Sequence, residues 1–135
     1  MRILLVDDEA DFLTPLIKRL ARRAIEAEGV NSGEQALALM DDKDPTQGFD
    51  AVVLDVSMPG MGGLATLKKL RQRHPLTPVI MLTGCADMQD AIAGLESGAF
   101  CHLMKPVDLD TLIWRIQDAH KERRLLEKRE AGKKP

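Results

Sequence analysis

The chain has 135 residues, of which 44% are hydrophobic and 30% are charged, a composition typical of one globular domain. Its 19 Lys and Arg against 21 Asp and Glu give a net charge of −2, which excludes a protein that binds nucleic acid or membranes through bulk positive charge. The sequence contains neither the ~20-residue apolar stretch of a membrane span nor a signal peptide. Two cysteines without metal-site spacing favour a reducing cytoplasm.

Short apolar runs predict β-strands at regular intervals along the chain. The three strongest are 3–6, 51–54 and 79–82, each a continuous hydrophobic run that suits a strand buried on both faces of a parallel sheet. A weaker strand is expected at 24–27 and another at 101–104. Five strands therefore form the expected sheet.

Amphipathic segments between these runs predict helices. In the first segment Phe12, Leu16 and Leu20 share one face, and Pro15 is expected in the first helical turn, where a missing N–H is tolerated. Strands that alternate with helices indicate a parallel sheet covered on both faces. The later helices are expected to begin at Ser32 or Gly33, near Leu64, at Asp87, and after Asp108 as an N-cap.

Polar residues stand where the predicted strands end. Asp7 and Asp8 follow the first strand, Asp55 the third, Thr83 the fourth and Lys105 the fifth. The carboxyl ends of parallel strands meet at one edge of the sheet, which is where open α/β sheets bind ligands. The sequence therefore predicts that three carboxylates, one hydroxyl and one ammonium group gather at this edge.

This set of groups suits phosphoryl transfer. Three neighbouring carboxylates repel one another, and Lys105 offsets only part of their charge. Oxygen ligands suit a hard cation such as Mg²⁺, and an Asp beside such an ion can act as a nucleophile and form an aspartyl-phosphate. Thr83 and Lys105 can donate hydrogen bonds to phosphoryl oxygens. We therefore expect a site that acts by positioning and electrostatics.

The same residues, with their flanking motifs, resemble the receiver domain of two-component response regulators. The resemblance covers roughly residues 1–119, and its pieces occur in the family's order. It implies an α/β fold of the flavodoxin type, a doubly wound five-stranded parallel sheet in the order 2-1-3-4-5 with helices on both faces. The matching pieces are LVDDE at 5–9, LDVSMPGM at 54–61, MLTG at 81–84, GA at 98–99 and KP at 105–106.

The resemblance implies a magnesium site. Asp8 would be the direct Mg²⁺ ligand, and Asp7 would act mostly through water. Asp55 and the backbone carbonyl of Ser57 would complete the protein's share of the metal shell.

It also implies roles in catalysis and switching. Asp55 would be the phosphoacceptor, Lys105 would pair with a phosphoryl oxygen, and the Thr83 hydroxyl would move toward the phosphoryl group as a switch. Pro106 matches a cis-proline of the family. His102 departs from the family, since it occupies the position of the usual Tyr or Phe beside the Thr. It either fills the aromatic slot or, because imidazole ionises near neutral pH, adjusts the coupling between phosphorylation and output.

The predicted function is a phosphorylation-controlled signalling switch. A sensor histidine kinase or a phosphotransfer protein would supply the phosphoryl group to Asp55, and the domain would catalyse its own phosphoryl transfer and dephosphorylation with Mg²⁺, without being an enzyme that acts on other substrates. Output is expected through the fourth helix, fifth strand and fifth helix, by homodimerisation or partner binding. Neither membrane contact nor direct nucleic-acid binding by this domain is expected, and the cytoplasm is the expected location.

Two other functions stay open. One is a phosphorylation-independent interaction module of the same fold. The other is a Mg²⁺-dependent phosphatase, which would need a second Asp at position 57, where Ser stands.

The charged tail is expected to lie outside the core of the domain. The receiver domain is predicted to span 1–119, and 120–135 to be an extension of the last helix or a linker, with seven Lys and Arg against three Glu. Arg123 and Glu127 have the i, i+4 spacing of a helical ion pair.

Overall fold

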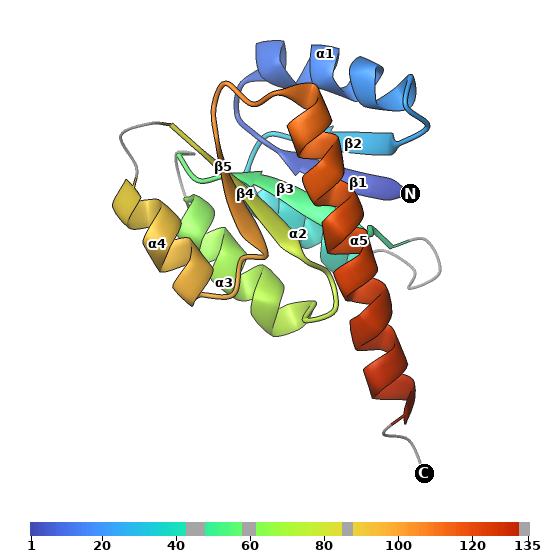
Figure 1. The fold of residues 1–135 in the computed structure, drawn as a ribbon. Coiled ribbons are helices and arrows are strands. Elements are labelled where there is room, and N and C mark those ends of the chain that lie inside the picture. Colours follow the sequence, from blue (N-terminus) through green and yellow to red (C-terminus); the bar gives the residue numbers. More distant parts are fainter. Residues whose placement is uncertain (43–47, 58–61, 85–87, 133–135) are drawn as a thin grey trace.

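The computed structural model describes residues 1–42, 48–57, 62–84 and 88–132. In these ranges five parallel strands form one sheet in the order β2-β1-β3-β4-β5, the order expected above. Helices α1 and α5 cover one face of the sheet, and α2, α3 and α4 cover the other (Figure 1). The elements are β1 (Arg2–Val6), α1 (Ala10–Ala21), β2 (Glu26–Val30), α2 (Gly33–Asp42), β3 (Ala51–Asp55), α3 (Gly63–Arg73), β4 (Val79–Thr83), α4 (Met88–Glu96), β5 (Cys101–Met104) and α5 (Leu109–Gly132).

Successive side chains of the central strands point to opposite faces of the sheet, and this divides the core into two layers. In β1, Ile3 and Leu5 pack with residues of α1 and α5, whereas Leu4 and Val6 pack with residues of α2 and α3. All four are at most 1% exposed, and burial of such a side chain contributes about 1.5–3 kcal/mol relative to exposure. A continuous apolar run therefore suits this position, because both faces of the strand are covered.

The second strand differs from the expectation. The predicted strand at 24–27 is wrong in its boundaries, since β2 runs from Glu26 to Val30 and Ala24 lies in the preceding turn with φ of 61°. β2 is an edge strand whose neighbour is β1, and it is only partly buried. Polar residues are tolerated there, so the strand has no continuous apolar run to reveal it.

Side-chain caps mark the starts of α2 and α5. Ser32 Oγ accepts the backbone N–H of Gln35 at 3.1 Å, and Asp108 Oδ2 accepts that of Thr111 at 3.1 Å. Pro15 was expected in the first turn of its helix, but α1 begins at Ala10 and places it in the second turn. Among the helices of these ranges, none has the length and apolar character needed to cross a bilayer.

Candidate functional site

The carboxyl ends of β1 and β3 bring three carboxylates together. Asp7 directly follows β1 and Asp55 is the last residue of β3, which lies beside β1 in the sheet. One carboxylate oxygen from each of Asp7, Asp8 and Asp55 lies within 4.8 Å of the others. Asp7 and Asp55 are buried, at 1% and 3% exposure, whereas Asp8 is exposed. The cluster is therefore open to solvent on the side of Asp8.

Lys105 supplies a positive charge to this cluster from the end of β5. Its Nζ lies 2.7 Å from Asp7 Oδ2 and 3.6 Å from Asp55 Oδ2, and it stands 4.5 Å from the centre of the Phe12 ring. Burial opposes the charge of this ammonium group, but the hydrogen bond to Asp7 and the charges of both carboxylates outweigh that effect, so the pKa of Lys105 is raised. Lys105 therefore stays protonated at neutral pH.

Asp55 is held by the backbone of the loop that follows it. The N–H of Ser57 donates to Asp55 Oδ1 at 3.0 Å, and in the segment between β1 and α1 the N–H of Glu9 donates to Asp7 Oδ1 at 2.9 Å. Burial and the negative charges of Asp7 and Asp8 raise the pKa of Asp55 against the lowering effects of the Ser57 amide and Lys105. The ionised carboxylate of Asp55 thus carries a free-energy cost that additional positive charge would relieve.

Thr83 is the last residue of β4, which flanks β3 on the side away from β1. Its side chain is fully buried, and its Oγ1 lies 2.6 Å from Nε2 of His102 in β5. The hydroxyl is thereby hydrogen-bonded toward β5. The peptide bond between Lys105 and Pro106 is cis.

The donor set fits a hard divalent cation. Three carboxylates and one ammonium leave a net negative charge at the cluster, and carboxylate oxygens are the ligands that Mg²⁺ and Ca²⁺ prefer. The role of the Ser57 carbonyl as a ligand stays a prediction. Residues 58–61 of the LDVSMPGM motif lie outside the described ranges.

One contact of the site was missed from the sequence. Phe12 was assigned only to the apolar face of its helix, yet its ring faces the Lys105 ammonium group. No spacing rule connects these two residues, because they meet through the packing of α1 against the end of the sheet.

Comparison with known proteins identifies the family. The family model of the response regulator receiver domain matches residues 3–117. The chain therefore belongs to the receiver domains of two-component response regulators.

Particular relatives agree with this assignment. The chain is 46% identical over 121 residues to the transcriptional regulatory protein CpxR of Klebsiella pneumoniae, covering 86% of this chain and 47% of CpxR. It is 36% identical over 114 residues to the DNA-binding transcriptional regulator NtrC of Salmonella typhimurium, covering 84% of this chain and 24% of NtrC. The chain thus spans a quarter to a half of the length of these curated relatives.

Solved structures share the whole fold. A response regulator receiver domain protein from Clostridium thermocellum superposes with a TM-score of 0.86 at 30% identity, covering 93% of this chain and 98% of that one. A structure described as adenylate cyclase from Rhodopirellula baltica gives a TM-score of 0.89 at 33% identity, covering 96% and 94%. The signalling switch is thus the supported function, in preference to the interaction module and the phosphatase.

Proposed function

We propose that this receiver domain accepts a phosphoryl group on Asp55 from a sensor histidine kinase or a phosphotransfer protein. One observation supports this proposal most directly: a buried carboxylate at the end of β3 lies within 4.8 Å of two other carboxylates and 3.6 Å from a lysine ammonium group. With such a donor, the proposed location of the protein is the cytoplasm.

The proposed metal is Mg²⁺, held by Asp8, Asp55 and the backbone carbonyl of Ser57, with Asp7 acting through water. When bound, the ion supplies positive charge that neutralises the carboxylates and the phosphoryl oxygens. Support comes from the raised pKa of Asp55, which burial raises first and the charges of Asp7 and Asp8 raise further, because a bound cation would relieve both effects. Because Asp8 is exposed, an ion can reach the cluster from solvent.

In the proposed transfer, a carboxylate oxygen of Asp55 attacks phosphorus while the phosphorus–nitrogen bond of a phosphohistidine breaks. The imidazole nitrogen keeps the electron pair and takes a proton from solvent. Lys105 lies close enough to Asp55 to pair with a phosphoryl oxygen, and Thr83 would exchange its bond to His102 for a bond to another. Hydrolysis by water would then return the Asp55 carboxylate and release phosphate.

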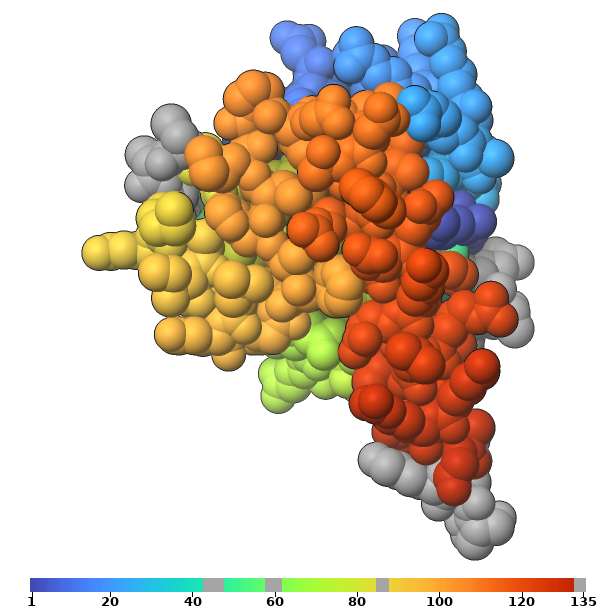
Figure 2. Space-filling model, viewed as in Figure 1, coloured from blue at the N-terminus to red at the C-terminus, as the bar shows by residue number. Residues whose placement is uncertain are grey.

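The proposed output face combines α4, β5 and α5, where a homodimer or a protein partner would bind. Large apolar side chains are exposed on all three elements, which run together on the side of the molecule seen in Figure 2. Trp114 is 72% exposed, and an exposed apolar surface of this kind marks many interaction sites. The others on these elements are Met88, Ile92, Leu95, Met104 and Leu125.

The proposal is tested by incubating the protein with acetyl phosphate and Mg²⁺ and measuring its intact mass. We expect the gain of one phosphoryl group, lost in Asp55→Asn and in excess EDTA. Asp110→Asn is the matched control, because Asp110 lies on α5 with its side chain 74% exposed. Phosphorylation of Asp55→Asn to the level of the unmodified sequence would contradict the assignment of the phosphoacceptor.

A further inference from the structure

The buried stripe of α5 continues past the end of the family match at residue 117. Leu112, Ile116 and Ala119 are fully buried, and the same spacing of four and three residues leads next to Arg123 and Leu126. Both of these are partly buried. A guanidinium group therefore occupies a position on the helix where an apolar side chain would be expected.

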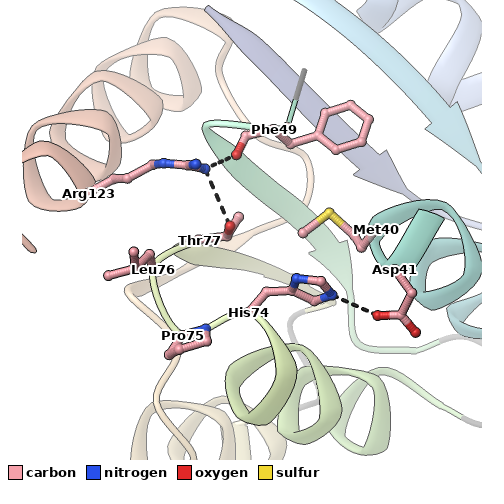
Figure 3. Close-up of a pocket in the computed structure, with 9 residues that line it drawn as sticks. Met40, Asp41, Phe49, His74, Pro75, Leu76, Thr77 and Arg123 are labelled. Atoms are coloured by element: carbon pink, nitrogen blue, oxygen red, sulfur yellow. Dashed lines mark hydrogen bonds and ion pairs between the residues drawn. The ribbon is translucent and has the colours of Figure 1, made fainter. Parts of the chain in front are cut away.

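Arg123 contacts the amino-terminal edge of the sheet, the edge opposite the carboxylate cluster (Figure 3). Its Nη1 donates to the backbone carbonyl of Phe49, shortly before β3, and to Thr77 Oγ1 at 3.3 Å, shortly before β4. Its Nε donates to Glu127 Oε1 at 2.9 Å, one turn further along α5. One side chain thus joins the helix to the starts of two strands.

The segment that Arg123 contacts is itself fixed to β1. Asp50 donates its backbone N–H to the Arg2 carbonyl at 2.7 Å, and its Oδ2 accepts the Arg2 N–H at 2.8 Å. Phe49 is only 1% exposed and belongs to the core. The carbonyl that Arg123 contacts is therefore part of the rigid frame of the sheet.

A second residue of α5 approaches the same segment. His120 Nδ1 lies 3.5 Å from Asp50 Oδ1, and this nitrogen is buried without a hydrogen bond in the described part of the chain. His120 therefore lies between α5 and the edge of the sheet.

The burial of Arg123 distinguishes it from an ordinary surface cation. Exposed ion pairs contribute little to stability, because water screens them and their side chains lose freedom. The Arg123 side chain is 18% exposed, and two of its partners are a backbone carbonyl and a hydroxyl rather than a mobile carboxylate. It also forms one wall of a cavity of about 320 Å³ whose other walls include Met40 and His74 (Figure 3).

We propose that Arg123 and His120 form a basal clamp, which makes residues 120–127 part of the folded domain rather than a linker. The clamp fixes the direction in which the remainder of α5 leaves the body of the protein, where its last turns project beyond the sheet (Figure 1). It fastens the helix to the starts of β3 and β4, the strands whose other ends carry Asp55 and Thr83. The projecting turns are thus presented as a rigid arm, and this inference does not depend on phosphorylation.

The test is hydrogen–deuterium exchange of the full chain, comparing Arg123→Ala with Arg124→Ala. The two variants lose the same charge at adjacent helix positions, but Arg124 is exposed. We expect Arg123→Ala to speed exchange in peptides covering 120–130 by about tenfold or more, since it removes hydrogen bonds from a charged donor. Arg124→Ala should stay within about twofold of the unmodified chain, and amides of β1 should be unchanged in both.

Exchange in Arg123→Ala within twofold of the unmodified chain would overturn the clamp, and so would equal acceleration in Arg124→Ala. If β1 also loses protection in Arg123→Ala, Arg123→Lys is measured instead, because lysine keeps the charge but cannot form the same forked contacts. Acceleration confined to 120–130 in that variant supports the clamp, and its absence overturns it.

Discussion

Thr83 Oγ1 lies 2.6 Å from Nε2 of His102, so the hydroxyl at the end of β4 is hydrogen-bonded to β5. Thr83 is fully buried, and its hydroxyl would be costly to leave without a partner. If Thr83 turns toward a phosphoryl group on Asp55, His102 must lose this bond or move with it. The pair would therefore couple the proposed phosphorylation site to the strand at the proposed output face.

We expect Thr83→Val to lower the free energy of unfolding by about 1 kcal/mol, because it leaves Nε2 of His102 without its hydroxyl partner. In a His102→Phe background, Thr83→Val should lower the free energy of unfolding by less, since the bond is already lost. Urea unfolding of the unmodified protein, the two single variants and the double variant gives the coupling energy. A coupling energy of zero would show that the bond does not stabilise the fold.

Asp55→Asn should stabilise the protein at neutral pH in the absence of divalent cations. Burial and the nearby carboxylates raise the pKa of Asp55 in the folded state. The protein is therefore more stable while Asp55 is protonated at low pH, and it loses this stability as the pH rises through the folded-state pKa of Asp55. Removing the charge should raise the midpoint of thermal unfolding by about 3–5 °C at pH 7, corresponding to about 1 kcal/mol. The gain should shrink toward pH 4, and Asp110→Asn should show no gain at either pH.

Lys105→Met should destabilise the protein at pH 7 by about 1–3 kcal/mol, because it leaves the buried carboxylates of Asp7 and Asp55 without their ammonium partner. The pKa of Lys105 is raised in the folded state. Lys105 therefore stabilises the protein fully below the ordinary lysine pKa, and this stabilisation is lost only as the pH rises through the folded-state pKa of Lys105. Chemical unfolding between pH 7 and pH 10 should therefore show a near-constant difference. A Lys105→Met variant as stable as the unmodified chain at pH 7 would show that this pairing is energetically neutral.

Mg²⁺ should raise the thermal midpoint of the unmodified protein, with about 1.4 kcal/mol of stabilisation at ten times the dissociation constant. Asp8→Asn should lose most of this effect, since Asp8 is the exposed carboxylate of the cluster. Asp110→Asn should keep it. If Asp8→Asn responds to Mg²⁺ as the unmodified protein does, the ion binds elsewhere.

The sequence predicts the sheet and the carboxylate cluster well, for a physical reason. Asp55 and Thr83 each end a fully buried strand, so an apolar run marks both the strand and the place of the polar group. The edge strand from Glu26 to Val30 lacks that signal because water reaches part of it. The ion pair of Arg123 with Glu127 is confirmed as predicted.

The contact of Arg123 with Phe49 could not be predicted. It joins a side chain to a backbone carbonyl 74 positions away, and a backbone acceptor has no sequence signature. The proximity of Lys105 to Phe12 is equally hidden, since it depends on how α1 packs against the sheet.

The most direct test of the central claim is chemical trapping of the phosphoryl group. The protein would be phosphorylated with acetyl phosphate and Mg²⁺, reduced with borohydride, which converts an aspartyl-phosphate to homoserine, and sequenced by peptide mass spectrometry. We predict homoserine at position 55, with Asp7 and Asp8 unmodified. Homoserine at another aspartate while position 55 remains Asp would contradict the assignment.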